Sequence, residues 1–275
     1  MIGKVGRPAS LTELWPMLDD GLSPMAGGTD LLVPGRDRPR RDVALLETIP
    51  GLDALETTEQ GLRLGALARL AVLERHAALR ERLPVLVQAI SCLGSPLIRN
   101  MGTLGGNLVT ASPAGDTLPA LLVLDAVVEL ASRHGRRALP LAEFLLGPGR
   151  TALGPGEILA AVRIPLPPTG AVQHFEKVGR RDALAIAVAS LAALVVRDQA
   201  GLVVEARLAV GSLAPTARRC PTAEAALRGR RLDREALLEV GRRIRDEISP
   251  QGDIRATAAY RREVAGRLPL RLLTL

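Results

Sequence analysis

Two short segments combine paired glycines with small polar residues, a composition suited to binding an anion through the backbone. They are residues 26–30, Ala-Gly-Gly-Thr-Asp, and residues 103–107, Thr-Leu-Gly-Gly-Asn, about eighty positions apart. Because glycine has no side chain, the backbone N–H groups beside it can approach a common anion closely. Two such loops from distant parts of the chain predict a pyrophosphate site that is contacted from both sides. The alternative is that each glycine pair forms an ordinary tight turn.

The sequence lacks the motifs of other phosphate sites and of catalytic centres. No G-x-G-x-x-G follows a predicted strand, and G-x-x-x-x-G-K-[ST] is absent. His76, His134 and His174 show no metal-ligand spacing, and Cys92 and Cys220 cannot build a four-cysteine metal site. Cys92 lies in an apolar stretch and is expected to be buried. We therefore predict a chain that binds a ligand without a catalytic or metal-ligating residue of its own.

Composition predicts a folded protein with an aliphatic core. Of the 275 residues 47% are hydrophobic, but only Trp15, Phe144, Phe175 and Tyr260 are aromatic. The net charge is +7, yet the arginines are scattered and few aromatic side chains could stack on bases, which argues against a nucleic-acid partner. No signal peptide is recognisable, and the longest nearly apolar run, residues 183–196, is shorter than the ~20 residues of a membrane span. We expect a cytoplasmic protein without a membrane span.

The elements around the glycine segments follow from capping, periodicity and breaker residues. Ser10, with Glu13 three residues later, predicts a helix N-terminus, although Pro16 could shorten or kink that helix. A short strand over residues 22–26 should lead into the first glycine segment, and residues 34–42 are typical of a loop. Further strands are predicted near Leu45 and over residues 62–64, and helices from near Leu70, over residues 85–93 and over residues 118–124.

The second half of the chain changes from mixed elements to a hairpin and helices. Strands are predicted over residues 127–132 and 158–164. The proline cluster at residues 165–168 is expected to mark a domain boundary. Beyond it, the apolar runs 191–196 and 202–210 predict a β-hairpin, and Asp233 is expected to cap a helix. The fold class is α+β. The predicted domains are residues 1–168, with subdomains of about 1–58 and 59–168, and residues 169–275.

The strings around both glycine segments resemble the two flavin-pyrophosphate loops of the xanthine dehydrogenase and carbon monoxide dehydrogenase flavoprotein family. These strings are residues 26–31, AGGTDL, and residues 98–108, IRNMGTLGGNL. The resemblance continues in the same order through residues 111–116, 124–126, 144–147, 157–159, 175–183 and 254–261, and so covers essentially the whole chain. The sequence departs from the family pattern at Thr29-Asp30, where His-Ser is frequent, and it has no cysteine-rich insertion for an extra cluster.

The resemblance implies FAD as cofactor and an α+β fold. A two-subdomain FAD-binding domain of the vanillyl-alcohol-oxidase-like type would precede a small C-terminal domain with an antiparallel sheet and helices. Asp116 would bind the adenosine ribose, Leu159 would meet the adenine or flavin end, and Lys177 would approach the isoalloxazine. The pyrophosphate would be held by Ala26, Gly27, Gly28, Thr29, Asp30, Thr103, Leu104, Gly105, Gly106 and Asn107. Blander interpretations stay open: a helix cap for Asp116, a solvated charge for Lys177 and a core residue for Leu159.

The resemblance also implies a function as the FAD-binding electron-transfer subunit of a molybdenum-containing hydroxylase or dehydrogenase. The molybdenum and [2Fe–2S] domains are not in this sequence, so a molybdenum-cofactor large subunit and a [2Fe–2S] small subunit are the expected partners. Electrons would pass from the iron–sulfur clusters to an external acceptor such as NAD or quinone. Two alternatives remain: a self-sufficient flavin oxidase or reductase of the same fold, and a binding module that has lost the cofactor.

Overall fold

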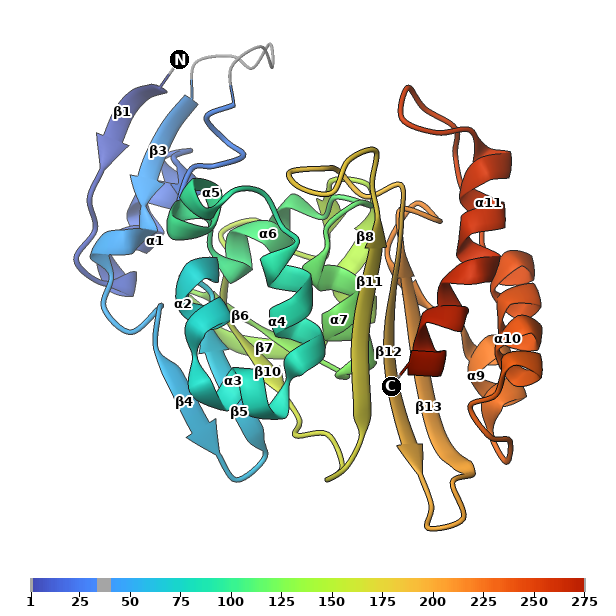
Figure 1. Ribbon diagram of the computed structural model, residues 1–275. Helices are drawn as coiled ribbons and strands as arrows, with labels where there is room; N and C mark the ends of the chain where they lie inside the picture. Colours follow the sequence, from blue (N-terminus) through green and yellow to red (C-terminus); the bar gives the residue numbers. More distant parts are fainter. Residues whose placement is uncertain (1, 34–40, 275) are drawn as a thin grey trace.

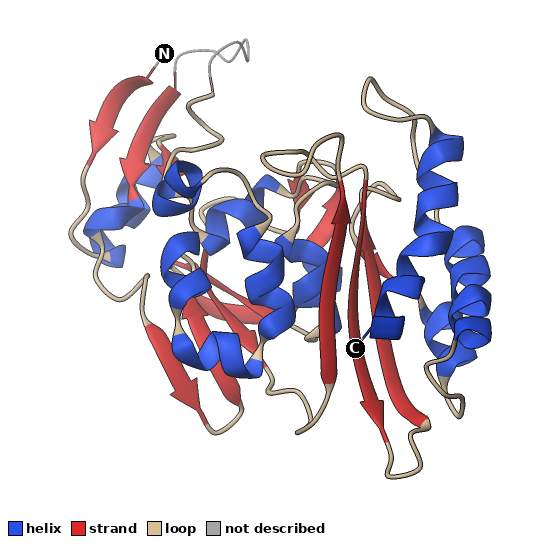
Figure 2. Cartoon of the chain, in the orientation of Figure 1, coloured by secondary structure: helices blue, strands red, loops and turns tan. Residues whose placement is uncertain are grey.

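The computed structural model describes residues 2–33 and 41–274, and it has the α+β architecture expected from the sequence. Figure 1 shows the chain running from a small sheet at one side, through a central sheet and its helices, to a second sheet covered by the C-terminal helices. Figure 2 shows the strands gathered in sheets with helices beside them, and helices at the C-terminal end of the chain.

The first layer is a three-stranded parallel sheet of order β1-β3-β2 with one helix beside it. Its elements are β1 (Ile2–Gly6), α1 (Leu11–Asp19), β2 (Ser23–Met25) and β3 (Arg41–Leu45), followed by the 3-10 turn η1 (Leu46–Thr48). The predicted cap is confirmed, because Ser10 Oγ accepts a hydrogen bond from Glu13 N at 3.2 Å, and the helix continues through Pro16. Of the loop predicted over residues 34–42, positions 34–40 lie outside the described residues. Arg41 and Asp42 were assigned wrongly, since they begin β3, where Arg41 pairs with Ile2 of β1.

The second layer is a five-stranded antiparallel sheet of order β4-β5-β10-β6-β7. The strands are β4 (Leu55–Thr58), β5 (Gly61–Gly65), β6 (Val127–Ser132), β7 (Gly135–Pro140) and β10 (Ile158–Ile164). Both β6 and β10 have the bounds predicted from the sequence. The central strand β10 carries apolar side chains toward both faces, which is why its sequence reads as a continuous apolar run.

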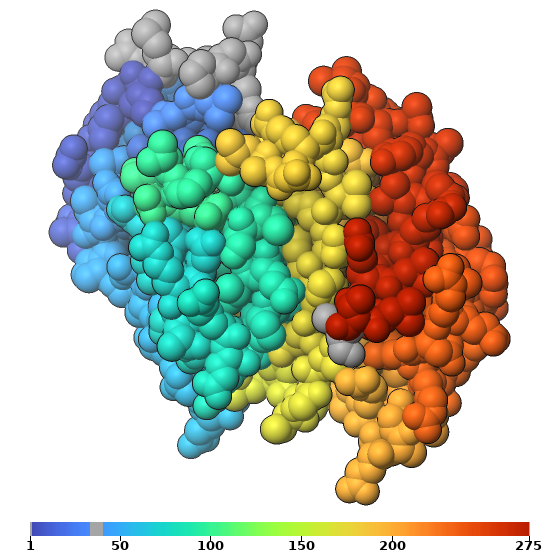
Figure 3. Space-filling model, in the orientation of Figure 1, coloured from blue at the N-terminus to red at the C-terminus, as the bar shows by residue number. Residues whose placement is uncertain are grey.

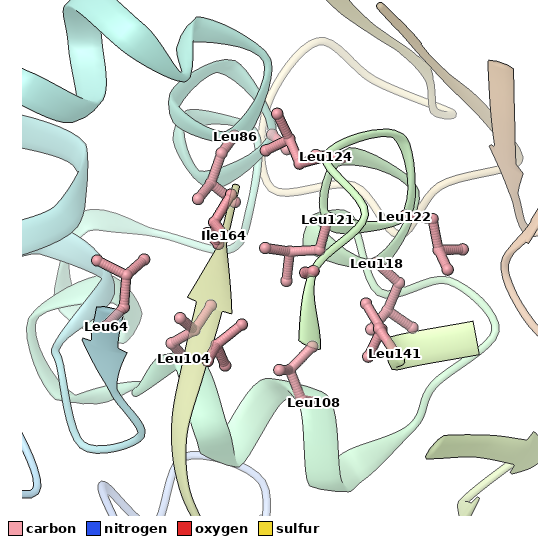
Figure 4. Packing of buried hydrophobic residues seen from close by; sticks show 14 of the residues in the cluster. Leu64, Leu86, Leu104, Leu108, Leu118, Leu121, Leu122, Leu124, Leu141 and Ile164 are labelled. Carbon is pink, nitrogen blue, oxygen red and sulfur yellow. The ribbon is translucent and has the colours of Figure 1, made fainter. Parts of the chain in front are cut away.

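Short helices cover the central sheet and build the main core. They are α2 (Leu70–Arg75), α3 (Ala77–Arg82), α4 (Pro84–Ser91), α5 (Pro96–Met101), α6 (Leu104–Thr110), α7 (Thr117–Val123) and α8 (Leu141–Phe144), with a small hairpin of β8 (Leu145–Gly147) and β9 (Arg150–Thr151). Figure 4 shows leucines from these helices meeting Leu64 and Ile164 of the sheet. The core is aliphatic, as composition predicts, with Phe144 as its one large ring among the most deeply buried side chains described.

The third layer is an antiparallel sheet of order β11-β12-β13-β14, placed between two groups of helices. Its strands are β11 (Val172–Val178), β12 (Ala189–Arg197), β13 (Val203–Gly211) and β14 (Arg218–Arg219), and its helices are α9 (Pro221–Leu227), α10 (Arg234–Glu247), α11 (Ala258–Arg267) and the 3-10 segment η2 (Leu268–Thr274). In β12, Ala192 and Leu194 face the main core, whereas Leu191 and Ala193 face the C-terminal helices. The predicted hairpin and the Asp233 cap are confirmed.

The connection between the central and third sheets is a segment without helix or strand. Residues 165–171 join β10 to β11, and they include the proline cluster of the sequence. Helices α4 and α7 nevertheless pack against β11, β12 and β13, so the layers on either side share one hydrophobic core. Over the described parts of the chain, no helix has the length and apolarity needed to cross a membrane.

Candidate functional site

A pocket of about 930 Å³ lies where both glycine segments meet the central sheet. Its walls come from elements that are far apart in the sequence: the turn after β2, helices α5 and α6, and the start of β10. The structure therefore gathers most of the predicted site residues around one cavity. Those that line it are Ala26, Gly27, Gly28, Thr29, Asp30, Thr103, Gly105, Gly106, Asn107 and Leu159.

The first glycine segment presents its backbone to the pocket. A Cβ atom built on Gly27 would lie 1.7 Å from Met101 O, so the turn approaches the end of α5 too closely for any side chain. Gly28 has a φ of +70°, a conformation that glycine adopts without strain. Within the described chain, the backbone N–H groups of Gly27, Gly28 and Thr29 have no hydrogen-bond acceptor. Three donors are thus left for a ligand beside the cavity.

The second glycine segment is the first turn of a helix, which corrects the prediction of a loop. Thr103 caps α6, since its Oγ1 accepts from Gly106 N at 3.1 Å. Gly105 N donates to Ala66 O at 2.8 Å, and Leu104 N donates to Ala68 O at 3.0 Å. The expectation that these backbone N–H groups point at an anion is therefore wrong. These N–H groups hold α6 against the end of β5. The bonded residues are more than thirty positions apart, so the local sequence does not predict the contact.

Two donors of the second segment nevertheless remain for a ligand. The backbone N–H of Thr103, a buried residue, has no acceptor in the part of the chain that the structure describes. The Oδ1 atom of Asn107 accepts a hydrogen bond from Thr117 Oγ1, which fixes the amide. Asn107 lines the pocket, and its Nδ2 group has no acceptor among the described residues. The second segment contributes these two donors and the open face of Gly106.

Three predicted site residues do not line the pocket. The side chain of Leu104 is fully buried in the main core. Asp116 and Lys177 form an ion pair with each other: Lys177 Nζ lies 2.6 Å from Asp116 Oδ2, and their side chains are only 8% and 6% exposed for lysine and aspartate. Lys177 Nζ also donates to the carbonyl of Cys92 at 2.8 Å. That carbonyl precedes Leu93, which lines the pocket, so the pair lies behind one wall of the cavity.

The ion pair decides the alternative structural roles considered for Asp116 and Lys177. Asp116 occupies the N-cap position of α7, but its side chain makes no capping hydrogen bond, so the capping interpretation is wrong. Lys177 is buried, so the interpretation as a solvated strand-end charge is wrong as well. Leu159 is buried in the core and lines the pocket at once. Cys92 corrects a further prediction, because it is exposed, whereas Cys220 is buried.

Burial of the pair changes the protonation of the aspartate. Removal from water raises the pKa of the Asp116 carboxyl to about 6, and the ammonium of Lys177 acts in the opposite direction without cancelling the effect. The other carboxylate oxygen, Oδ1, is buried without a hydrogen-bond partner. Desolvation thus outweighs the short bond to Lys177, and part of the carboxylate is left unsatisfied.

The raised pKa predicts a pH dependence of stability. The folded pKa of about 6 exceeds the ordinary 3.8, so the folded chain holds a proton that the unfolded chain releases between these values. The free energy of unfolding should therefore fall as pH rises from about 4 to 6, by roughly 3 kcal/mol for this group. Urea unfolding of the wild type and of Asp116→Asn at several pH values tests this. Equal pH profiles for the two proteins would assign the dependence to other groups.

Family models and known proteins match the chain along almost its whole length. Residues 2–167 match the model described as the FAD binding domain in molybdopterin dehydrogenase. Residues 173–274 match the carbon monoxide dehydrogenase flavoprotein C-terminal domain. The nicotinate dehydrogenase FAD-subunit of Eubacterium barkeri is 34% identical over 244 residues, which cover 87% of this chain and 82% of the relative. The carbon monoxide dehydrogenase medium chain of Afipia carboxidovorans is 31% identical and covers 94% and 91% of the two chains.

Solved structures agree with these matches. A chain of carbon monoxide dehydrogenase from Hydrogenophaga pseudoflava superposes with a TM-score of 0.94 at 28% identity, covering 100% of this chain and 96% of that one. A chain of quinoline 2-oxidoreductase from Pseudomonas putida 86 gives 0.92 at 25% identity, covering 98% and 95%. This chain belongs to the family of FAD-binding subunits of molybdopterin dehydrogenases. It is thus a subunit of an oxidoreductase, its cofactor is FAD, and the family expected from the glycine strings is confirmed.

The pocket of this FAD-binding subunit has donors that fit a pyrophosphate. Among the described residues, the N–H groups of residues 27–29, which are half-buried, and of Thr103, which is buried, have no acceptor and can donate to anionic oxygens. Gly106 leaves open space toward Ala26, since a Cβ built on it would lie 4.0 Å from the Ala26 Cβ. Among the described residues, no group of three or more His, Cys, Asp or Glu side chains is arranged to hold a metal ion.

Sequence reasoning missed several residues of the pocket wall. Arg41 lines the cavity but was assigned to a loop, because the preceding residues are charged and proline-bearing. Thr110, Ser112 and Glu157 also line it. Ser112 and Glu157 stand in strings that carry the family resemblance, so their place in those strings was the available signal. Arg137 and Gly154 N hold the Glu157 carboxylate, and the bond from Arg137 lowers its pKa.

Proposed function

We propose that this chain is the electron-transfer subunit of a molybdenum hydroxylase complex. It receives electrons from the [2Fe–2S] clusters of a partner subunit and passes them to an external acceptor such as NAD or quinone. The observation that carries the proposal is the pocket between the two glycine segments, in a chain matched throughout by FAD-binding subunits. The names of the relatives, an FAD-subunit and a medium chain, support a place in an assembly with other subunits.

In this proposal the backbone holds the cofactor and apolar walls keep water out. The N–H groups of residues 27–29 and Thr103 donate to the pyrophosphate, with the Asn107 amide as a further donor. Gly105 brings α6 against Ala66, and Gly106 keeps the face of α6 open toward Ala26. Leu93 and Leu159 form apolar parts of the wall. The bound flavin supplies the capacity to accept single electrons and release two.

The roles suggested for Asp116 and Lys177 are proposed for the pair as a unit. The ammonium and the carboxylate neutralise each other next to the wall at Leu93. The electric field of the pair in the pocket is therefore that of a dipole, which is weaker than the field of a single charge. We propose that they position the segment 92–93 through the bond from Lys177 to the Cys92 carbonyl. The sequence-based roles at the ribose and the isoalloxazine stay predictions.

The self-sufficient flavoenzyme is the second candidate, and it would need a group that acts on a substrate above the flavin. The titratable side chains described in the pocket wall are Asp30, Arg41 and Glu157. Glu157 is held by Arg137, with N–O distances of 2.7 Å, so it is engaged in an ion pair. This pocket chemistry favours a binding role over substrate transformation.

Two further expectations belong to this proposal. Both cysteines are free, which fits a reducing compartment, and we place the complex in the cytoplasm. We also propose the division into residues 1–168 and 169–275, with subdomains of about 1–58 and 59–168. The two family matches end at residue 167 and begin at residue 173, which supports that division.

An absorption spectrum of the purified chain tests the proposed function first. We expect flavin bands, and release of FAD on heating or acidification, because the pocket offers free donors for its pyrophosphate. Colourless protein that takes up added FAD would indicate loose binding without partners. Colourless protein that fails to take up FAD would contradict the electron-transfer role and favour the cofactor-free binding module.

A further inference from the structure

Exposed apolar side chains gather on helices α2 and α5, next to the cofactor pocket. Leu97 is 77% exposed, Val72 52% and Met101 45%. Leu97 and Met101 are four positions apart in α5 and therefore lie on the same side of that helix. Helices α2 and α5 pack against each other, and Arg99 of α5 binds Glu74 of α2 at 2.8 Å. Figures 1 and 3 show the two segments side by side on one face.

A hollow with positive charge adjoins these apolar residues. It has a volume of about 310 Å³ and is formed by α2, α3 and α5. Arg75 and Arg80 line it without a carboxylate partner among the described residues, whereas Arg99 and Glu74, which also line it, are paired with each other. An unpaired guanidinium in a hollow favours a carboxylate from elsewhere, because the planar fork matches two oxygens at once.

Helix α5 separates this surface from the cofactor pocket. Ile98 of the same helix lines the pocket, while Pro96, Arg99 and Asn100 line the arginine-bearing hollow. An α-helix with its side chains is about 10 Å across. A partner seated on the outer side of α5 would therefore come within roughly one helix of the pocket.

We propose that this surface binds the subunit that delivers electrons to the chain. The α2–α5 surface is defined by Val72, Arg75, Arg80, Leu97 and Met101. Its partner presents apolar side chains to Leu97 and carboxylates to the two arginines. The proposal rests on the proposed function, which supplies an electron-donating partner subunit. A second copy of this chain fits poorly, because it would bring arginines against arginines on a protein of net charge +7.

The test uses the chain co-expressed with the other subunits of its complex. Leu97→Glu combined with Val72→Glu places charge on the exposed apolar residues of both helices, where interface hot spots are expected to concentrate. We expect the Kd of the chain for the complex to rise at least about thirtyfold, the change typical of losing a central apolar contact, and the chain to be lost from the complex peak on gel filtration. Flavin content should stay at the wild-type value, because neither side chain lines the pocket. The matched control is Val204→Glu, an apolar residue of β13 that is 54% exposed.

A second variant keeps the test independent of folding. Arg75→Glu with Arg80→Glu reverses two charges that no described group pairs, and it should weaken assembly most at low salt. Normal assembly of both double variants would overturn the assignment of this surface while leaving the flavin role intact. A wild-type chain that carries flavin but elutes alone would overturn the partner as well. A wild-type chain without flavin would instead contradict the proposed function.

Discussion

Replacing Gly106 by valine is expected to weaken FAD binding in a chain that still folds. A Cβ atom at this position lies 2.9 Å from Thr103 Oγ1 and 4.0 Å from the Ala26 Cβ, with no other atom within 4 Å. The larger side chain therefore grows into the gap between the two glycine segments. Steric overlap of this kind costs about 1–3 kcal/mol, or roughly 5- to 150-fold in the Kd for FAD. Flavin content and FAD titration of the apoprotein measure the effect.

Three further glycine variants test whether the loss of FAD binding depends on the position and size of the new side chain. Gly106→Ala should give a smaller loss, because alanine adds one atom and favours the helix by up to about 1 kcal/mol relative to glycine. Gly147→Ala is the matched control, since its Cβ would meet nothing closer than 3.9 Å and the residue does not line the pocket. Gly105→Ala should fail earlier, at folding, because its Cβ would lie 2.8 Å from Ala66 O. Full flavin occupancy in Gly106→Val would show that α6 does not contact the bound FAD at this position.

Substituting Lys177 by methionine is expected to destabilise the folded chain strongly at pH 8. The change leaves the Asp116 carboxylate buried without its cation, and loss of one partner from a buried pair costs about 3–5 kcal/mol. The cost should shrink as pH falls from 8 toward 6, because loss of Lys177 raises the pKa of Asp116 above its wild-type value of about 6 and protonation then removes the charge that needs a partner. Urea unfolding at pH 5 and pH 8 measures both parts of the prediction.

A double variant without either charge distinguishes the effect of an unpaired charge from the effect of lost side-chain packing. Lys177→Met with Asp116→Leu should recover most of the stability, since apolar replacement of a buried ion pair is often neutral. Arg230→Met provides the surface control: its partner Glu235 is 88% exposed, and such pairs contribute less than about 1 kcal/mol. A wild-type unfolding midpoint in Lys177→Met would mean that the ion pair contributes nothing. It would also return the lysine to its sequence-based role at the isoalloxazine, which a lowered reduction potential of the bound flavin would support.

Local signals predicted the elements that have strong periodicity or caps. Strands β6 and β10 have the expected bounds, and the caps Ser10 and Asp233 bind the predicted backbone groups. Strands β1 and β4 and helices α3 and α5 were missed. They are short, and their stability comes from pairing or packing with distant segments, which neighbouring residues do not encode.

The sequence by itself determined the family, the cofactor and most of the glycine-segment residues that line the pocket, because glycine strings and their order are local and specific. Tertiary structure alone decided how those residues work. It held the second glycine segment, as the start of α6, by a hydrogen bond from Gly105 N to Ala66 O, and it left the N–H groups of Gly27, Gly28 and Thr29 without an acceptor among the described residues. It also paired Lys177 with Asp116, which is 61 positions away. Hydrogen-bond partners and desolvation depend on which distant groups become neighbours, and only the folded chain settles that.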